Sequence, residues 1–379
     1  MSAATMTVLD LLDDLIRIDS VNPGLDSASA GEARIAAHVA EWGRSAGLRV
    51  DVLENTPGRP SVLLRGGDNV GGRRLLLCGH LDTVALVGVE EPLTPRVAGD
   101  RLYGRGAYDM KAGLAAALVS CRDAAHAGIT GEVIVAAVAD EEHASLGVQE
   151  VLAHLDPAGI DAAVVTEPTE RQVGTAHRGF VWTEVAVTGV AAHGSRPHLG
   201  ADAIYAAAHH LVAFDRLDQQ LRERSHPFVG AGNLHASLIA GGTGESTIPD
   251  RCVFTVERRI LPGETLERVE ADVADVRERS RSADPRLTVS ARTVLHRPAL
   301  HTDHDADIVT TMLAAAGPGA SVAAMSYWAD SAFLAAAGIP TVLYGPDGDG
   351  AHADVEWVSC SGTSTTAAVL TRLARDFCR

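Results

Sequence analysis

The stretch Leu75-Leu-Leu-Cys-Gly-His80-Leu-Asp82-Thr-Val84 decides the fold that the sequence predicts. Its first four residues form a short apolar run, as in a strand that is buried on both faces of a sheet. The run ends at His80 and Asp82, whose side chains leave the strand end on the same side because they are two residues apart. In α/β sheets, ligands gather at the carboxyl ends of the strands. The stretch therefore predicts a central strand with a ligand site at its end.

Helix-like and strand-like segments alternate on both sides of this run. Apolar residues recur at helical spacing in some segments, and Asn22-Pro23-Gly24 ends the first of these patterns. The expected helices are 6–18, 31–47 and 114–126, and the expected strands are 48–53, 61–65, 132–139 and 161–166. This alternation predicts an α/β domain built on a mostly parallel central sheet.

The pattern changes near His177 and resumes after Pro298. Between these points we expect strands at 179–188, 233–240, 252–260 and 286–293, and helices at 200–214 and 264–280. That β-α-β-β-α-β order is typical of a ferredoxin-like α+β domain with an antiparallel sheet. We therefore predict an inserted domain at 177–293, flanked by residues 1–176 and 294–379 of a single metal-binding domain. Helices at 307–316 and 331–337, a strand at 340–344 and a final helix are expected in the second flank.

The composition limits the classes of function. The formal charge of the 379 residues is −17, which argues against nucleic acid and anionic membrane surfaces as partners. No apolar run reaches the ~18 residues of a membrane span, and the N-terminus lacks a basic and then apolar secretory signal. We therefore expect a cytoplasmic protein. Five scattered cysteines without a CxxC pair argue against a disulfide framework or a thiolate zinc site.

His80 and Asp82 form the first candidate pair for chemistry. A metal-bound imidazole usually donates its second N–H to a carboxylate, which fixes its tautomer. Taken alone, the pair is explained as well by a surface histidine beside an unrelated aspartate. Asp109 lies in Gly104–Gly113, a glycine-framed loop before a helix, where its carboxylate could bridge two cations or cap the helix. Lys111, the only lysine, could be a structural ion-pair partner or a catalytic group.

More carboxylates and a histidine follow. Asp140-Glu141-Glu142 ends an apolar strand, and its mutually repelling carboxylates indicate a nearby positive charge; a solvated acidic turn is the alternative. Glu167 follows the strand at 161–166, and His352 lies in a glycine-containing loop, although one histidine among 16 says little alone. Two-metal hydrolysis needs carboxylate ligands and an unligated carboxylate that takes a proton from water. Histidines and carboxylates without cysteine suit Zn²⁺, and also Co²⁺ or Mn²⁺.

These residues lie in motifs that together resemble those of one family. The motifs are GHLDTV (79–84), GRGAYDMKAG (104–113), ADEE (139–142), TEPT (166–169), AAHGSRPHLGADAI (191–204), ERRILPGE (257–264) and GAHADVEWV (350–358). Over essentially its full length the chain resembles the M20 metallopeptidases, in particular the branch of acetylornithine deacetylases and succinyl-diaminopimelate desuccinylases. The resemblance implies a catalytic domain with two divalent metal ions, most often Zn²⁺, and an inserted lid that also forms a homodimer.

The resemblance implies a role for each matching residue of the metal site. One ion is expected on His80, Asp109 and Glu167. Asp109 is expected to bridge to a second ion, which Glu142 and His352 complete. Asp82 is expected to orient His80, and Glu141 to act as general base and then as general acid.

The resemblance also assigns residues of the lid. His193 matches a histidine that, in dimeric relatives, stabilises the oxyanion in the partner's active site. Arg259 matches the arginine that binds the substrate carboxylate, a task that suits bidentate pairing. The chain departs from the family at Ser246 (in Ser-Thr-Ile-Pro-Asp) and His235, where relatives usually have Asn. Both belong to the substrate-contacting part of the lid, so Ser246 is a candidate substrate-binding residue and the specificity stays open.

The predicted activity is hydrolysis of a linear amide. Water shared by the two metal ions, with Glu141 as general base, would remove an acetyl or succinyl group from an amino acid such as N-acetylornithine. A dipeptidase or aminopeptidase with the same metals is the alternative. A third hypothesis is a non-catalytic binding protein on this scaffold. Such a protein would be expected to have lost Glu141 or a metal ligand, whereas this chain has Glu141 and every expected ligand.

Overall fold

The computed structural model describes residues 3, 5–86, 88 and 90–379. The chain divides into two compact units: residues 1–175, 302–323 and 329–379 form the first, and residues 176–301 and 324–328 form the second. The second unit extends past the predicted boundary at 293 because strand β16 (Thr288–Arg297) continues beyond it. It also includes residues 324–328, which the sequence did not indicate. Among the described residues, no helix is long and apolar enough to cross a membrane.

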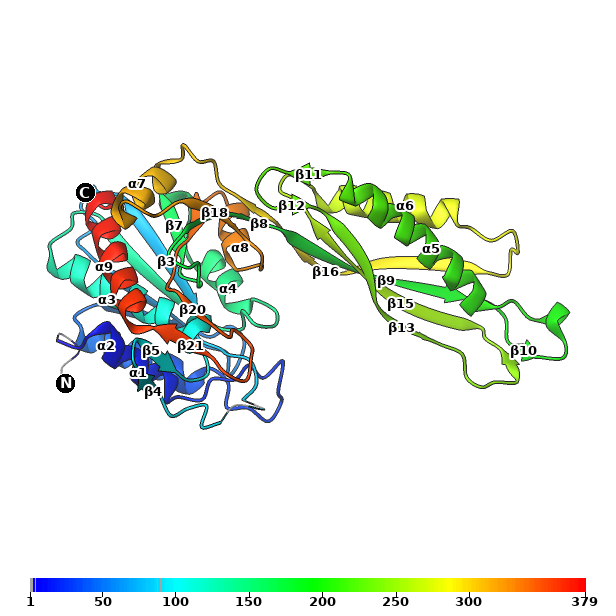
Figure 1. The fold of residues 1–379 in the computed structure, drawn as a ribbon, viewed down its shortest axis with the longest axis horizontal. Helices are drawn as coiled ribbons and strands as arrows, with labels where there is room; N and C mark the ends of the chain where they lie inside the picture. Colours follow the sequence, from blue (N-terminus) through cyan, green and yellow to red (C-terminus); the bar gives the residue numbers. More distant parts are fainter. Residues whose placement is uncertain (1–2, 4, 87, 89) are drawn as a thin grey trace. The chain divides into compact units, whose positions relative to one another are not determined.

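A mixed sheet forms the centre of the first unit (Figure 1). In the described part of the chain its spatial order is β1 (Arg49–Leu53), β2 (Ser61–Gly66), β6 (Glu132–Val138), β3 (Arg74–His80), β7 (Ala162–Val165), β19 (Thr341–Leu343), β8 (Val173–His177) and β17 (Leu300–His301), and β18 (Val322–Met325) pairs with β8. Strands β6, β3, β7 and β19 pair in parallel. The remaining pairs for which the direction is established are antiparallel. The predicted α/β class is confirmed. The sheet is less parallel than expected, because parallel pairing is confined to its middle strands. Strands β1 and β2, for example, are joined by a short loop that permits only antiparallel pairing.

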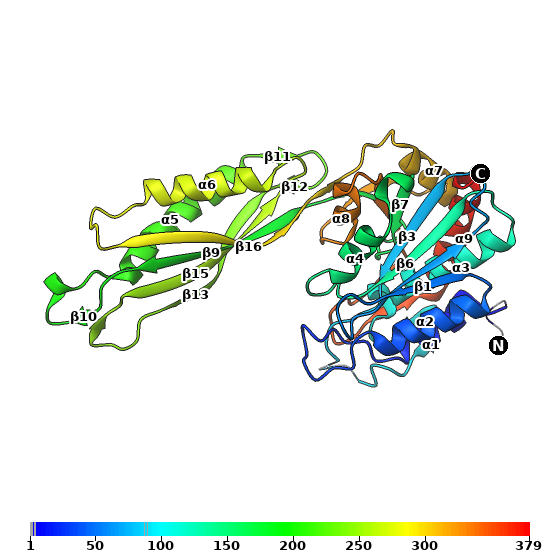
Figure 2. The same cartoon turned by 180° about the vertical axis from the view of Figure 1, so that it is seen from behind.

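The register of the central strands brings their polar ends together. His80 pairs with Val138 of β6, and Cys78 pairs with Val165 of β7. Continued by two residues, this register places Asp82 beside Asp140, and His80 beside Glu167. Side chains that are far apart in the sequence therefore meet at one edge of the sheet, as is usual for the carboxyl ends of parallel strands. Figure 2 shows β3, β6 and β7 running alongside one another.

Helices pack around this sheet. One buried cluster joins the sheet to α1 (Val8–Ile16), α2 (Ala33–Ser45), α3 (Ala112–His126), α7 (Asp307–Ala316) and α9 (Cys360–Phe377), and α4 (Leu146–His154) and α8 (Ser331–Ala336) contact each other and the sheet. Helices α3 and α9 lie side by side (Figure 1). The first turn of α3 lies very close to the end of β7. A Cβ atom at Gly113 would overlap the carbonyl oxygen of Thr166, so this approach requires glycine. This contact fixes the start of α3 next to the polar sheet edge.

A second, small sheet joins two loops of the site. It consists of β4 (Arg96–Ala98), β5 (Arg101–Tyr103), β21 (Trp357–Ser359) and β20 (Gly348–Asp349). Trp357 pairs with Tyr103 in antiparallel fashion. The loop that follows β5, which carries Asp109, therefore lies beside the loop before β21, which carries His352.

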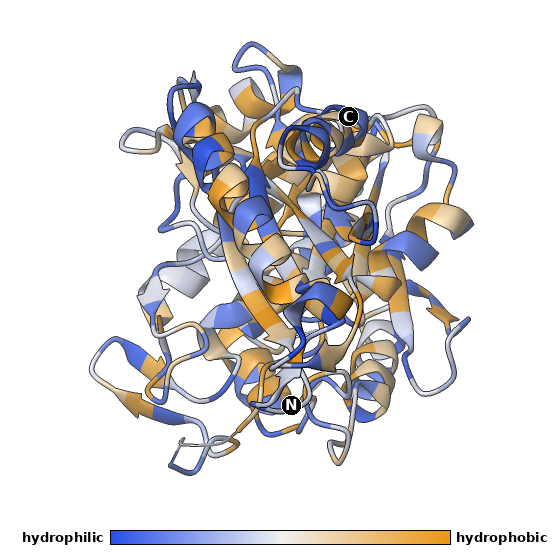
Figure 3. Ribbon diagram, turned by 90° about the vertical axis from the view of Figure 1, so that its right-hand side faces the viewer, coloured by the Kyte–Doolittle hydropathy of each residue, from blue (hydrophilic) through white to orange (hydrophobic). Residues whose placement is uncertain are grey.

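The second unit is an α+β sandwich. Its antiparallel sheet has the order β13 (Asn233–Gly241), β15 (Arg251–Ile260), β9 (Gly179–Thr188) and β16, and helices α5 (Ala203–Arg222) and α6 (Leu266–Arg279) cover one face. Short strands β10 (Ala192–His193), β14 (Thr247–Ile248), β11 (Ser225–His226) and β12 (Gly230–Ala231) form two further ribbons. Buried and partly exposed residues alternate along β9 and β15, as expected for a sheet with one covered face. Figure 3 colours the ribbon by hydropathy and shows hydrophobic and hydrophilic residues mixed along the helices and strands.

Candidate metal centre

His80 lies at the end of β3 with a defined ring orientation. Its Nδ1 lies 2.9 Å from the main-chain oxygen of Asp82, and a hydrogen bond to this carbonyl requires the proton on Nδ1. Nε2 faces the carboxylates, at 3.1 Å from Asp109 Oδ1 and 3.7 Å from Glu167 Oε1, and it presents a lone pair to them when the ring is neutral. This neutral tautomer is the one in which Nε2 can bind a metal ion.

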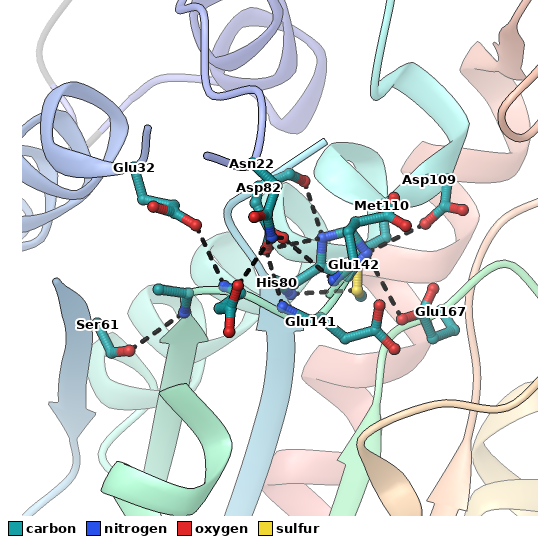
Figure 4. Close-up of polar contacts among 12 residues, drawn as sticks. Asn22, Glu32, Ser61, His80, Asp82, Asp109, Met110, Glu141, Glu142 and Glu167 are labelled. Carbon is teal, nitrogen blue, oxygen red and sulfur yellow. Dashed lines mark hydrogen bonds and ion pairs between the residues drawn. The ribbon is translucent and has the colours of Figure 1, made fainter. Parts of the chain in front are cut away.

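Asp82 contacts both His80 and the two glutamates that follow Asp140. Its Oδ1 is 3.6 Å from His80 Nδ1, so Asp82 orients the imidazole mainly through its main-chain oxygen. The carboxylate instead accepts hydrogen bonds from the backbone amides of Glu141 (3.2 Å) and Glu142 (3.1 Å). Asp82 therefore positions the two adjacent glutamates, as Figure 4 shows.

A buried polar network supports this turn, and the sequence patterns did not reveal it. The side-chain amide of Asn22 donates to Asp82 Oδ2 at 2.6 Å and to Asp140 Oδ1 at 3.0 Å. Arg59 donates from one Nη to both Asp140 and Glu32 at 2.6 Å, and the Asp140 amide donates to Glu32. Of these residues only Asn22 carries a local sequence signal, because Asn22-Pro23-Gly24 predicts the end of a helix.

Asp109 lies between two groups of candidate ligands. Its Oδ1 faces His80, and its Oδ2 is 3.3 Å from His352 Nε2. His352 Nε2 is also 3.1 Å from Glu142 Oε2. The first group is His80, Asp109 and Glu167, and the second is Asp109, Glu142 and His352; within each, one ligand atom per residue lies within 4.8 Å of the others. The two oxygens of Asp109 thus face different groups, as a bridging carboxylate requires.

Glu356 holds the Asp109 loop in place and was not singled out from the sequence. Its carboxylate accepts hydrogen bonds from the Arg105 side chain and from the backbone amides of Gly106, Tyr108 and Asp109, at 2.8–3.0 Å. Glu356 lies four residues after His352, so one side chain ties both ligand loops together. Its position within the GAHADVEWV motif was the available signal.

Electrostatics at the site favour cations. Burial raises the pKa of Glu141 and Glu167 well above the ordinary carboxyl value, and neighbouring carboxylates raise it further. Hydrogen bonds to Asp109 and Glu142 raise the pKa of His352 to about 10. Although burial opposes it, the pKa of Asp109 lies below its usual range, because His352 and protonated His80 donate hydrogen bonds to its carboxylate. These carboxylates therefore attract positive charge, from protonated histidines or from metal ions.

The residues present fit a pair of divalent cations. Two imidazoles and three carboxylates are hard and borderline donors that suit Zn²⁺, Co²⁺ or Mn²⁺. Glu142 Oε1 is buried and has no hydrogen-bond partner in the described part of the chain, as a carboxylate oxygen reserved for a ligand would be. Glu141 belongs to neither ligand group, although Figure 4 shows it in the same cluster as Glu142 and Glu167. Its carboxylate is therefore available for proton transfer.

Lys111 contacts main-chain carbonyls rather than the carboxylate partner that an ion pair would need. Its Nζ donates to the main-chain oxygens of Leu15 and Ile18, each at 3.0 Å, at the end of α1. Burial lowers the pKa of Lys111 to about 8. Lys111 therefore joins the Asp109 loop to α1 through backbone carbonyls rather than through an ion pair.

The candidate residues of the lid lie in the second unit, at two separate places. His193 on β10 pairs with Thr247, and the amide of Gly194 donates to the Ser246 carbonyl, so His193 and Ser246 are neighbours. Arg259 lies near the other end of β15. The nine residues from Arg251 to Arg259 are joined by eight steps and span about 26 Å of extended strand. Figure 1 shows β10 at the end of this unit opposite to β11 and β12.

Residues 76–376 match the sequence profile of peptidase family M20/M25/M40. The chain belongs to this family. The predicted M20 membership is thereby confirmed, and the chain is a metallohydrolase of the class that acts on amide bonds. Its two ligand groups agree with the dinuclear metal binding described for another M20 member.

Known M20 relatives cover almost the whole chain. An acetylornithine deacetylase from Vibrio atlanticus is 28% identical over 380 residues, which are 98% of this chain and 98% of that protein. One from Myxococcus xanthus is 30% identical over 327 residues, which are 84% of this chain and 83% of that protein.

Solved structures share the M20 fold. A tripeptidase from Staphylococcus aureus has a TM-score of 0.76 at 20% identity, with 98% of this chain and 97% of the other covered. A dinuclear metal-binding M20 peptidase from Bacillus subtilis has a TM-score of 0.75 at 14% identity, with 97% of each chain covered. At these identities the likeness establishes the fold, including both units.

Proposed function

We propose that this M20 enzyme removes an N-acyl group, such as acetyl or succinyl, from an amino acid. One observation carries the chemistry: Asp109 directs one oxygen to each of two ligand groups, and the unligated Glu141 lies beside them. The acetylornithine deacetylases that align with 84–98% of the chain support an N-acyl amino acid as substrate.

His80, Asp109 and Glu167 would hold one divalent ion, and Asp109, Glu142 and His352 a second. Zn²⁺ is the first choice for this donor set, with Co²⁺ or Mn²⁺ as alternatives. When bound, such ions polarise an amide carbonyl and lower the pKa of water. Asp82 and Asn22 would hold the backbone of Glu141 and Glu142 so that one glutamate remains a ligand and the other a base.

Glu141 would take the proton of the attacking water and later donate it to the leaving amine. These two transfers need a carboxylate that is close to the ligands and not one of them. Glu141 meets both conditions, because it follows the strained residue Asp140, whose φ of 70° turns the chain away from β6. The network of Asn22, Arg59 and Glu32 holds Asp140 in this conformation.

Arg259 would bind the substrate carboxylate. Its guanidinium lies 5.0 Å from the centre of the Phe180 ring, and its Nε donates to Glu257 at 2.7 Å. Neither Nη of Arg259 has a partner among the described residues, so both can donate to a carboxylate. The side chain is thus fixed by two contacts while its bidentate end stays free.

His193 would stabilise the oxyanion from a second copy of the chain. Its Nδ1 accepts a hydrogen bond from the Ser195 amide, so neutral His193 carries its proton on Nε2 and can donate it. His193 lies on the β10–β14 ribbon, next to the Arg251 end of β15, and Arg259 lies about 26 Å further along that strand. One amino-acid derivative does not span this length, so it would not touch both residues within one chain. A site that uses both residues therefore takes them from two chains.

Edge strand β13 and helix α5 would form the dimer surface. In the described part of the chain β13 pairs only with β15, and its Leu238 and Ile239 are 70% and 59% exposed. Tyr205 on α5 is 73% exposed. The unpaired backbone groups of an exposed apolar edge strand can pair with another strand. The same strand from a second copy of the chain can pair with it in a symmetric dimer.

A substrate panel tests the proposal. Purified protein with added Zn²⁺ or Co²⁺ should hydrolyse at least one of a set of N-acetyl and N-succinyl amino acids that includes N-acetyl-L-ornithine. Cleavage of dipeptides alone would replace the proposal with a peptidase, and no cleavage of either class would end it.

Glu141→Gln tests the base. We expect turnover to fall at least about a hundredfold, because general-base catalysis is lost, with metal content unchanged because Glu141 is not a ligand. The matched control is Glu41→Gln on the exposed side of α2, which should retain full activity. If Glu141→Gln retains most of the activity, Glu141 is not the base.

A further inference from the structure

Aromatic side chains gather on the uncovered face of the sheet in the second unit. The chain is only 4% aromatic and has four tryptophans, yet Trp182 and Trp328 lie here with Phe180. Phe180 and Trp182 alternate along β9 with Val181 and Thr183, which are buried. Trp182 remains 39% exposed. We call Phe180, Trp182 and Trp328 the aromatic shelf.

The shelf has a fixed geometry. The Phe180 ring lies 5.7 Å from that of Trp182 and 6.0 Å from that of Trp328, in a T-shaped arrangement with the latter. Both indole N–H groups are engaged: Trp182 donates to Glu257 at 2.8 Å, and Trp328 donates to the Pro298 carbonyl at 2.9 Å. The rings are therefore held as an oriented apolar surface, of the kind that packs against another ring.

The register of the sheet places this shelf next to Arg259. Phe180 pairs with Arg259 on β15 and with Arg297 on β16. Trp182 pairs with Glu257 in the neighbouring row. Paired residues project from the same face of a sheet, so a carboxylate on the two Nη atoms of Arg259 lies beside the rings.

The charges around the shelf disfavour a cationic ligand. The guanidinium of Arg297 lies 5.5 Å from the Trp328 ring, and that of Arg259 lies over Phe180. Glu257 is the acidic residue in the two rows of paired residues that contain Phe180 and Trp182. Its two carboxylate oxygens already accept hydrogen bonds from the side chains of Arg259 and Trp182. An ammonium group placed here meets two arginines and a carboxylate that is already bonded.

We propose that the aromatic shelf is the subsite for the side chain of the substrate's amino acid, and that this side chain is aromatic or large and apolar rather than cationic. The inference rests on the proposed function, in which Arg259 binds the α-carboxylate. In the substrate, only the α-carbon separates this carboxylate from the amino-acid side chain. When Arg259 binds the carboxylate, the substrate's side chain therefore lies next to Phe180 and Trp182. Ring contacts and the burial of apolar area then favour phenylalanine, tryptophan or leucine over ornithine or lysine.

The test compares kcat/KM for one acyl group on different amino acids. The substrates are the N-acetyl derivatives of L-phenylalanine, L-leucine, L-alanine, L-ornithine and L-lysine, with Zn²⁺- or Co²⁺-loaded full-length enzyme. We expect the phenylalanine and leucine derivatives to exceed the ornithine derivative by about tenfold or more. A preference for N-acetylornithine or N-acetyllysine overturns the inference and leaves the proposed function intact. Failure to cleave any N-acyl amino acid overturns both.

Trp182→Ala separates a subsite from a structural role. We expect KM for N-acetyl-L-phenylalanine to rise about tenfold, kcat/KM for N-acetyl-L-alanine to stay within about twofold, and Trp182→Phe to restore the low KM. The control is Phe228→Ala, an exposed aromatic of the same unit that should leave both substrates unaffected. Equal losses on both substrates, or no loss on either, overturn the inference. Thermal melting of each variant verifies that it is folded, and Trp182→Phe keeps the test decisive if Trp182→Ala unfolds.

Discussion

At the scale of single residues, the candidate centre depends on side chains that touch no substrate. Asp140 adopts a left-handed conformation, which costs a non-glycine residue about 1–3 kcal/mol unless its surroundings enforce it. Asn22 and Arg59 donate to its carboxylate, and Glu32 accepts from its amide. The backbone direction of Glu141 is therefore fixed by residues from three distant parts of the chain.

Replacement of Asn22 by alanine tests this network. The variant Asn22→Ala removes two donated hydrogen bonds and leaves Asp82 and Asp140 buried with fewer donors. We expect the free energy of unfolding to fall by about 1–3 kcal/mol, and kcat to fall about tenfold with little change in KM. Urea unfolding, steady-state kinetics and metal analysis measure these effects. Asn55→Ala, at an exposed position, is the control; an unchanged kcat in Asn22→Ala would show that the network does not position Glu141.

At the scale of elements, strand β8 carries a histidine that is buried without charge. Its residues Val173–His177 are all buried. Burial lowers the pKa of His177 to about 4, although a hydrogen bond to the Arg178 carbonyl acts in the opposite direction. The strand therefore folds with a neutral imidazole, and the unfolded chain binds a proton at a higher pH than the folded chain.

His177 makes stability depend on pH in a defined window. The pKa is near 6.5 in the unfolded chain and near 4 in the folded one, so the unfolded state binds more protons between these values. Stability due to His177 is complete above pH 6.5 and falls as the pH approaches 4, by about 3 kcal/mol in total. Thermal midpoints of wild type and His177→Gln, measured with a chelator from pH 7.5 to 4.5, should converge as the pH falls. Parallel curves would contradict the assignment.

At the scale of the whole molecule, the proposed active site needs two chains. Arg259 lies on β15, whereas His193 lies on the separate β10–β14 ribbon at the other end of this unit, so a dimer would supply the pair that we propose one chain cannot. The edge strand β13 and helix α5 offer the apolar surface for it. Oligomeric state and activity should then change together.

Complementation between two inactive variants tests this arrangement. Glu141→Gln lacks the base, and His193→Ala lacks the oxyanion donor. In a mixed dimer, the chain with intact Glu141 receives His193 from its partner, so co-expression should restore a substantial part of the activity. Activity that stays at the level of the separate variants would show that His193 acts within its own chain.

Substitution of the exposed edge strand provides the matching assembly test. Leu238→Glu should give monomers in size-exclusion chromatography with light scattering, because it places a charge on the apolar surface. Activity should fall roughly as far as in His193→Ala, with metal content unchanged. Val70→Glu, an equally exposed position of the first unit, should change neither property. An active monomer would contradict the two-chain site.

The sequence by itself determined the elements and the ligand types. Apolar periodicity indicated the central strands and the main helices, because the spacing of apolar residues encodes which face of an element is buried. The position of His80, Glu142 and Glu167 just after apolar runs was enough to predict that they gather at one sheet edge. Motif resemblance supplied Asp109 and His352, whose loops carry no periodic signal.

Only the tertiary structure decided how these residues are held. Asn22, Arg59 and Asp140 meet although they are dozens of residues apart, and the Glu356 carboxylate closes the Asp109 loop from the other end of the chain. The ring contact between Phe180 and Trp328 likewise joins segments that are far apart in the sequence. Local periodicity specifies segments, whereas pairing and side-chain hydrogen bonds depend on which segments pack together, and that information is spread over the whole chain.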